Sequence, residues 1–192
     1  MKKKRGWHLS LRAAAYILLY LAIFAVPTSS WAAYDAFLKI DTLPGESQDT
    51  AHKDWIDLSS WRWGDFTSST APGGTMGGSS APARPDPTLT VTMPVNRASP
   101  NLFLFHAMGK RLTKAVLAVR RPGAQGPTPD FLTITFDDFV ISSYQSTWST
   151  KDPNLPPIDE ITLKFYKVTI EYKDRSGRPV KVIWDYKQNV PR

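Results

Sequence analysis

The chain has 192 residues, with 24 lysines and arginines, 17 acidic residues and no cysteine. A chain of this length fits one domain that buries about two thirds of its surface. The lack of cysteine excludes disulfide-rich scaffolds and thiolate metal sites.

Residues 1–32 have the pattern of an export signal. Positions 2–12 contain five lysines and arginines and no acidic residue, and the apolar run Ala13–Val26 follows. As a helix this run reaches about 21 Å, short of the roughly 30 Å hydrocarbon core of a bilayer. The small residues Ser30 and Ala32 stand at the positions that a signal peptidase recognises before its cleavage site. We therefore predict a signal peptide at 1–32 and a mature domain at 33–192, with cleavage after Ala33 or an uncleaved anchor as the alternatives.

Removal of this segment changes the charge of the protein. The mature domain keeps 19 basic and 17 acidic residues, so most of the net charge of +7 belongs to the signal. A nucleic-acid-binding domain would keep a basic face, and we therefore expect no nucleic-acid partner and no membrane contact after cleavage. The expected location is secreted, extracellular or periplasmic, or cytoplasmic if the true start lies downstream.

Alternating apolar residues predict several strands. Leu89, Val91 and Met93 alternate with threonines, which indicates a strand with one buried face. The same period appears in 114–120 and in 180–187, where Val180, Val182, Trp184 and Tyr186 form the apolar set.

Two longer strands change the parity of their apolar residues partway along. The change falls between Phe136 and Phe139 in DFLTITFDDFVISSY, and between Phe165 and Val168 in EITLKFYKVTIEYK. Such a change requires a bulge or a passage between packed layers, and bent long strands close sheets into barrels. We therefore predict a mainly β fold, a small antiparallel β-barrel with bulged strands.

One short helix and one long loop interrupt the strands. Ser99 suits an N-cap, Pro100 suits the first helical position and Gly109 suits the exit. The apolar residues of this helix should cover one end or side of the barrel; they are Leu102, Phe105 and Met108. The Gly-, Pro- and Ser-rich stretch 64–87 is too long for an ordinary hairpin loop, and such loops are either functional or disordered.

No catalytic, cofactor or metal site is recognisable. His52 and His106 lack metal-ligand spacing, and His106 is expected to pack or cap. Asp137 and Asp138 could suggest paired carboxylates, but neighbours on a strand point to opposite faces. We therefore expect solvated bulge residues here, no enzyme, no cofactor and no bound metal.

The order of several segments resembles the Hcp family, the haemolysin-coregulated proteins of type VI secretion systems. AYDAFLKID, LPGES and HKDWIDLSSWRWG are similar to the start of these proteins. SPNLFLFHAMGKRLTKAVLAVRRPG resembles their helix and following strand. FLTITFDDFVISSYQS, DEITLKFYKVTIEYK and VIWDYKQN resemble their central and closing strands. The resemblance covers essentially all of residues 33–190.

This resemblance implies a structural role. Hcp proteins have a barrel-like fold, similar to phage tail-tube proteins, and form hexameric rings that stack into an inner tube. The expected partners are copies of the same chain, the spike, the sheath and effectors carried in the lumen. The resemblance also places Arg62 on the lumen side, where a ring of arginines would favour acidic cargo.

The resemblance and the strand pattern also suggest assembly residues. The long loop would reach an adjacent ring or subunit, which makes its glycines and their neighbours candidates: Gly64, Asp65, Phe66, Gly73, Gly74, Met76, Gly77 and Gly78. Apolar side chains on the outer parity of a filled barrel need a partner surface. These subunit-interface candidates are Phe37, Val116 and Ile183, although single exposed apolar residues are also ordinary.

The signal peptide departs from the family pattern, because tube subunits are normally assembled in the cytoplasm. The alternative function is therefore an exported Hcp-like binding or surface protein that works without a contractile machine.

Overall fold

The computed structural model describes the chain in separate stretches, which are residues 34–41, 43–66, 86–121, 129–148 and 156–191. The predicted signal peptide lies outside these described residues and stays a prediction. Within them, no helix has both the length and the apolar character needed to cross a membrane.

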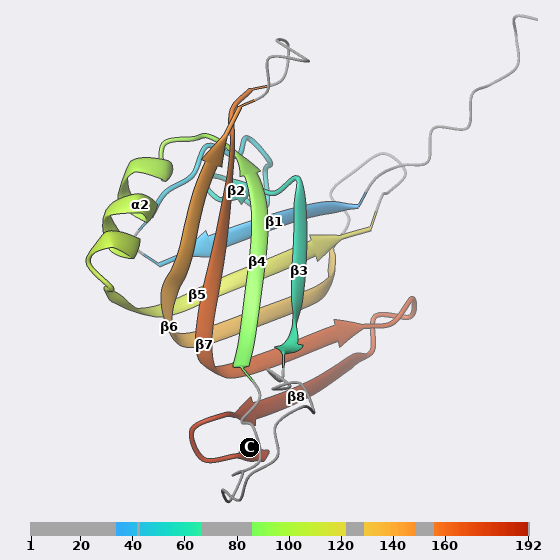
Figure 1. The fold of residues 1–192 in the computed structure, drawn as a ribbon. Helices are drawn as coiled ribbons and strands as arrows, with labels where there is room; N and C mark the ends of the chain where they lie inside the picture. The colour runs from blue at the N-terminus through green and yellow to red at the C-terminus, as the bar shows by residue number, and fades with distance from the viewer. Residues whose placement is uncertain (1–33, 42, 67–85, 122–128, 149–155, 192) are drawn as a thin grey trace, which may run out of the picture. The chain divides into compact units, whose positions relative to one another are not determined.

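The described strands form one antiparallel sheet, and the one described helix lies at its side (Figure 1). Its order is β2-β1-β5-β6-β7-β4-β3, and β8 and β9 extend from β7. The elements in chain order are β1 (Asp35–Ile40), β2 (Ile56–Asp57), β3 (Ser60–Phe66), β4 (Asp86–Pro94), α2 (Ser99–Ala107), β5 (Arg111–Arg120), β6 (Asp130–Thr147), β7 (Ile158–Lys173), β8 (Pro179–Asp185) and β9 (Val190–Pro191).

The two longest strands belong to both layers of this sheet. β7 pairs with β4 through Ile158–Lys164 and with β8 through Lys167–Lys173, while it pairs with β6 along most of its length. In Figure 1 the layer with β3 and β4 crosses the layer with β1 and β5, and β6 and β7 bend from one into the other. The sheet therefore wraps around its core.

The bend coincides with the parity change expected from the sequence. Phe136 and Phe139 are both buried on β6, and Val168 and Phe165 are both buried on β7. The register places Phe136 beside Val168 and Phe139 beside Phe165, so both strands change parity at the same point without a register shift there. Asp138 lies in this step with a φ of 55°, the left-handed region in which asparagine and aspartate are enriched among residues other than glycine. The register shift itself comes later, between Ile141 and Ser143.

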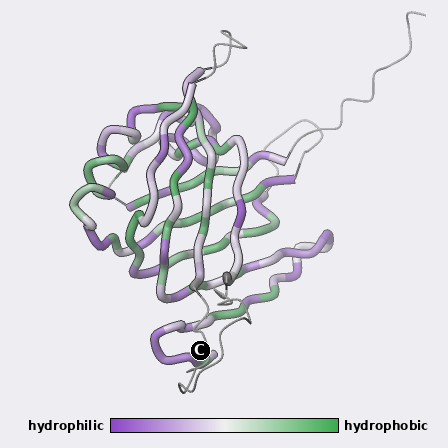
Figure 2. The backbone as a smooth tube through the Cα atoms, viewed as in Figure 1, coloured by the Kyte–Doolittle hydropathy of each residue, from purple (hydrophilic) through white to green (hydrophobic). Residues whose placement is uncertain are grey.

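The mainly β, barrel-like fold is thus confirmed, and the inner face of the sheet forms the core. Phe136 and Phe165 are fully buried with ring centroids 4.6 Å apart. Figure 2 shows the hydrophobic and hydrophilic positions alternating along the strands that surround them. The terminal strands β2 and β3 do not pair with each other in the described part of the chain, so no ladder closes the barrel there.

The predicted helix is present but starts differently. Ala98, not Ser99, is the N-cap, and Asn96 secures this turn by accepting the Ala98 N–H at its side-chain oxygen (2.9 Å). Gly109 ends the helix with a φ of 58°, as predicted. Leu102 is buried in the core, whereas Met108 is 66% exposed, so its expected packing role is wrong.

Two further expectations need correction. Gly64, Asp65 and Phe66 were expected in a loop, but they lie on β3 and pair with Thr88–Asp86 of β4. The ladder continues because β4 begins at Asp86, before the alternating segment that was recognisable in the sequence.

The apolar face of β8 is also less buried than its alternation predicted. Val180 and Val182 are 60% and 53% exposed, whereas Trp184 packs partly against the core. The strand ends at Asp185, and Tyr186 follows in a turn. Alternation marks which side a residue faces and does not by itself supply a covering layer.

Candidate functional site

The residues expected to line a tube or join subunits are scattered over the sheet. Arg62 is exposed on β3, opposite Thr90 of β4. Val116 on β5 and Ile183 on β8 are half-buried. The remaining loop candidates lie outside the described residues; they are Gly73, Gly74, Met76, Gly77 and Gly78.

Phe37 does face away from the core, as its parity predicted, but it is not free. It is only 5% exposed and does not belong to the inner core cluster. The His52 ring covers it, with ring centroids 4.2 Å apart and planes 7° from parallel. The expected role of Phe37 as an exposed subunit contact is therefore wrong, because the chain itself supplies the covering surface.

That covering surface is the segment 44–55 between β1 and β2, which we call the strap. Its ends are joined by backbone hydrogen bonds, from Gly45 N–H to Asp54 O (2.8 Å) and from Ser47 N–H to Trp55 O (2.9 Å). A Cβ at Gly45 would lie 2.2 Å from Trp55 O, so only glycine fits this close approach. Arg97 holds the same end by donating to the Gly45 carbonyl oxygen.

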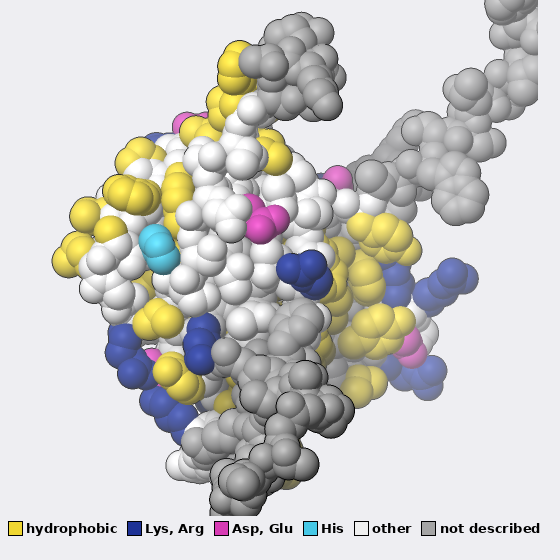
Figure 3. Space-filling view, viewed as in Figure 1, with side chains coloured by type: hydrophobic (Ala, Val, Ile, Leu, Met, Phe, Trp, Pro, Cys, Tyr) yellow, Lys and Arg dark blue, Asp and Glu magenta, His cyan; other side chains and the backbone are white. Residues whose placement is uncertain are grey.

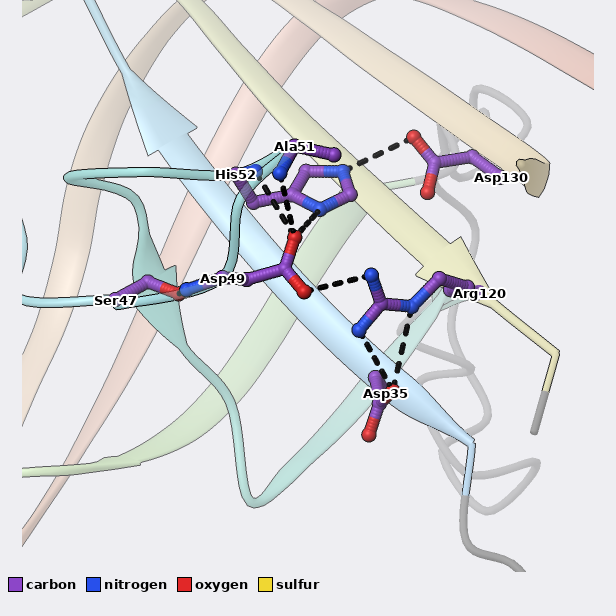
Figure 4. A network of polar contacts seen from close by, with 7 residues as sticks. All are labelled: Asp35, Ser47, Asp49, Ala51, His52, Arg120 and Asp130. Atoms are coloured by element: carbon purple, nitrogen blue, oxygen red, sulfur yellow. Dashed lines mark hydrogen bonds and ion pairs between the residues drawn. The ribbon is translucent and has the colours of Figure 1, made fainter. Parts of the chain in front are cut away.

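A polar network fixes the middle of the strap to the sheet (Figure 4). Asp49 Oδ1 accepts the backbone N–H groups of Ala51 and His52, each at 3.0 Å, which closes the local turn. The His52 ring then bridges two carboxylates: Nδ1 lies 3.0 Å from Asp49 Oδ1, and Nε2 lies 3.0 Å from Asp130 Oδ2 on β6. This histidine joins two segments that lie far apart in the sequence.

Arg120 extends the network across β5 and β1. Its guanidinium donates to Asp49 Oδ2 (2.6 Å) and to Asp35 Oδ2 (2.9 Å), and it lies over the Phe37 ring at 5.2 Å. Partial burial opposes ionisation of Asp49, but hydrogen bonds from Arg120, His52 and the strap amides outweigh it. They lower the pKa of Asp49 to about 2. This carboxylate is therefore ionised at neutral pH.

The geometry of this network fits a structural tie. A hydrolytic triad would need a nucleophile on the free side of the histidine. Here both ring nitrogens face carboxylates, and Ser47 Oγ instead accepts the Asp49 N–H (3.3 Å). In the part of the chain that the structure describes, no group of three or more His, Asp or Glu side chains is arranged to hold a metal ion.

The other polar residues singled out in the sequence also stabilise the fold. His106 Nδ1 lies 2.9 Å from Ile141 O and ties α2 to β6. Asp138 binds Arg111 and Lys187 at the bend, and the Arg111 hydrogen bond, followed by that of Lys187, lowers its pKa. Asp137 Oδ2 lies 3.8 Å from Lys167 Nζ. Asp137 and Asp138 thus have separate cationic partners and do not act as a carboxylate pair.

One more ionisable group is partly buried near the far end of β6. Burial raises the pKa of Tyr144 to about 12, and Asp159 adds to the shift. Tyr144 therefore keeps its proton at neutral pH, and its ring packs edge-on against Phe103 of α2 at 5.7 Å.

Among the described residues, two apolar surfaces stay exposed. The first, which we call the hairpin face, consists of Tyr172 on β7 with Val180 and Val182 on β8. The second, which we call the helix face, consists of Phe103, Leu104 and Met108. In Figure 3 hydrophobic side chains gather over α2 at the left of the view, and another group lies toward the right, where Figure 1 places β7 and β8.

The strap network was missed in the sequence, although one local signal was available. An aspartate three residues before a histidine, as in Asp49 and His52, suits a turn in which the carboxylate accepts backbone N–H groups. Asp130 and Arg120 could not be added, because they lie about 70 to 80 residues further along the chain and only the β5-β6 ladder brings them beside the strap.

Comparison with known proteins gives a consistent result. A family model described as "Type VI secretion system effector, Hcp" matches residues 37–172. Protein hcp1 of Pseudomonas aeruginosa is 31% identical over 164 residues, which cover 82% of this chain and 98% of that protein.

Solved structures agree with this match. The crystal structure of Hcp1 from Salmonella typhimurium superposes with a TM-score of 0.70 at 31% identity, covering 83% of this chain and 99% of that one. A type VI secretion system effector from Yersinia pestis gives a TM-score of 0.62 at 25% identity, covering 79% and 99% of the two chains.

Proposed function

Because this chain belongs to the Hcp family of type VI secretion system proteins, we propose that it is a tube subunit that assembles into hexameric rings. The rings stack into an inner tube, and effectors travel in the lumen. The work of the protein is mechanical, with cargo carriage and without catalysis.

The uncovered apolar surfaces carry the assembly part of this proposal. A ring needs one heterologous contact, in which two different surfaces of the same chain meet and repeat until the ring closes. The hairpin face and the helix face are two such surfaces, built from different elements. Contiguous exposed apolar side chains of this kind mark protein interaction sites more often than isolated ones do.

The composition of the helix face supports an apolar partner. α2 has the sequence SPNLFLFHA and contains no Lys, Arg, Asp or Glu. Charged residues are depleted in the centre of protein interfaces, where aromatic residues and methionine are enriched. A second copy that presents Tyr172, Val180 and Val182 offers matching chemistry.

Within the same proposal, Arg62 faces the lumen and the segment that follows β3 reaches a neighbouring ring or subunit. Arg62 is exposed, as a lumen residue must be. The spike caps the tube and the sheath surrounds it. Replacement of Arg62 by Ala or Glu should weaken retention of acidic cargo, and unchanged retention would remove this role.

The test is assembly of a hairpin-face variant. Val180→Lys with Val182→Lys should leave a folded subunit that no longer forms rings, measured by sedimentation and electron microscopy at the same protein concentration as the wild type. Val190→Lys is the matched control, because Val190 is a comparably exposed valine on β9 outside the hairpin face. A wild-type protein that sediments as a single subunit, with no rings, would contradict the proposal.

The predicted signal peptide favours a second candidate function, an exported Hcp-like protein that acts outside the cytoplasm without a contractile machine. Intact-mass measurement on cytoplasm, periplasm and medium distinguishes the two. Processing after Ala32, with secretion that persists in cells lacking the sheath, supports the exported protein. An unprocessed chain whose release needs the sheath supports the tube subunit.

A further inference from the structure

The His52 ring occupies a position that only one protonation form satisfies fully. Both of its nitrogens lie 3.0 Å from carboxylate oxygens, of Asp49 and Asp130, and its side chain is 4% exposed. An ionised carboxylate only accepts hydrogen bonds, while a neutral imidazole has one donor nitrogen and one acceptor nitrogen. A neutral ring would therefore set a lone pair against a carboxylate oxygen in a buried place.

We propose that His52 is a proton-dependent clasp, which holds the strap closed over Phe37 when both ring nitrogens donate and loosens it when one proton is lost. The inference concerns the single subunit and does not depend on ring assembly.

The charges around the ring support this assignment. The groups that face it are Asp49 on the strap and Asp130 on β6, and Arg120 on β5 joins Asp49 to Asp35 on β1. Arg120 binds Asp35 and Asp49, while His52 is the only hydrogen-bond partner of Asp130 found among the described residues. Loss of the second imidazole proton leaves the cluster with three carboxylates and one guanidinium.

The remaining neighbours of the ring do not compensate for that loss. Phe37 stacks on it, and Trp55 meets its edge with centroids 4.8 Å apart. Lys39 lies 5.7 Å above the Trp55 ring, on the side of the tryptophan rather than on a carboxylate of the network. The pKa of Asp49, about 2, keeps that group ionised from mildly acidic to alkaline pH, so this partner of the ring accepts hydrogen bonds throughout that range.

Opening of the strap would have a defined structural result. Phe37 and its cross-strand neighbour Ala118 lie on the outer side of β1 and β5, and both are buried. The His52 ring is the cover that stacks on Phe37. Release of the strap therefore exposes an apolar strip that is absent from the surface in the closed form.

The experiment follows amide hydrogen exchange of the whole purified chain from pH 5.5 to 9, corrected for the intrinsic pH dependence of exchange. The strap amides of Gly45 and Asp54 are hydrogen-bonded to Asp54 O and Ser47 O and report closure. Their protection factors should fall about tenfold or more from pH 5.5 to 9, because one pKa unit of coupling between protonation and opening changes the opening equilibrium tenfold. Core amides of β4 and β7 should not change in parallel.

Asp130→Asn is the matched variant, because an asparagine N–H can donate to a ring nitrogen. In this variant a neutral His52 has both partners satisfied, so protection of the strap should become nearly independent of pH. Equal pH dependence in Asp130→Asn and the wild type would overturn the proposal. So would wild-type protection that stays constant from pH 5.5 to 9.

A second measurement keeps the test decisive even where the variant folds poorly. Nitrogen-15 spectra of the wild type should show His52 doubly protonated while the strap amides are protected. His106 is the internal control, since among the described residues only its Nδ1 has a hydrogen-bond partner, the Ile141 carbonyl. A singly protonated His52 in a protein with a fully protected strap would contradict the clasp.

Discussion

The strap and the hairpin face give opposite answers to the same problem. Each concerns apolar side chains that the barrel core cannot accept: Phe37 on the outer side of β1, and Val180 with Val182 on β8. Phe37 is 5% exposed because the strap folds back over it, whereas Val180 and Val182 stay more than half exposed. One group is covered within the chain, and the other stays exposed in the described part of the structure.

The difference shows what separates an outer residue that the subunit covers from one that it leaves exposed. In both regions the parity of a residue along its strand shows which side of the sheet it faces. Parity does not show which segment, if any, covers that side. Coverage depends on distant groups, such as Arg120 and Asp130, which hold the strap through charge-assisted hydrogen bonds. Mutations in the two regions should therefore differ in whether they change folding or association.

The largest effect on folding is expected from Phe37→Ala. Loss of a nearly buried aromatic side chain typically costs about 3 kcal/mol or more of unfolding free energy, and here it also removes the surface on which His52 stacks. Urea unfolding at fixed protein concentration measures this. Val182→Ala is the comparison, and it should cost well under 1 kcal/mol because Val182 is mostly exposed. Similar costs at the two sites would remove the distinction between the regions.

Gly45→Ala should destabilise the strap by about 2 kcal/mol through overpacking. The added Cβ meets the Trp55 carbonyl oxygen at 2.2 Å, and the atoms in the way are backbone, which cannot rotate aside. Thermal unfolding and strap amide exchange measure the effect. Gly64→Ala is the control, since nothing lies within 4 Å of a Cβ there. A stable Gly45→Ala with an unchanged strap would show that the close approach relaxes without cost.

Much of this fold was predictable because local patterns encode it. Alternation marked β4 and β5, and Gly109 marked the end of the helix. The matched parity changes near Phe136 and Phe165 indicated the bends before the pairing of β6 with β7 was known. These features depend on neighbours within a few residues, which is the range that periodicity captures.

The strap and the exposed hairpin were not predictable for the same physical reason. Burial of Phe37 and exposure of Val182 both depend on which remote segment covers the sheet. The contact of His52 with Asp130 spans 78 residues, and no local pattern reports it. Met108 was misplaced similarly, because its spacing grouped it with Leu102, whereas it lies just beyond the end of α2 and is 66% exposed.

Acid should weaken the strap more than the hairpin. The pKa of Asp49 is lowered from 3.8 to about 2, so at pH values between these two the folded state binds fewer protons than the unfolded state. Its contribution, about 1 to 2 kcal/mol, is complete above about pH 4 and is lost as the pH falls through about 2. Unfolding free energy measured from pH 5 to 2 should fall less steeply in Asp49→Asn.

Asp174 in the turn between β7 and β8 is the control for this acid effect. Hydrogen bonds, first from Ser176 and then from Arg178, lower its pKa to about 2 as well. This turn is open to water, which screens its charges, so Asp174→Asn should change the acid slope less than Asp49→Asn. A steeper effect at Asp174 would mean that the hairpin, not the strap, limits acid stability.

The smallest effect on the folded subunit is expected from Val182→Thr. Threonine keeps the β-branched shape that strands favour, and the side chain is mostly exposed, so unfolding free energy should change by about 0.5 kcal/mol or less at low protein concentration.

At high protein concentration the effect of Val182→Thr should differ. Association stabilises only the folded state, so a wild type whose hairpin face is covered by a second copy gains stability with concentration. Val182→Thr places a hydroxyl in that contact and should reduce the gain, whereas Phe37→Ala should lower stability at every concentration. If Val182→Thr and the wild type respond identically to concentration, then the hairpin face is ordinary exposed surface, and the contrast with the strap reduces to a difference in burial alone.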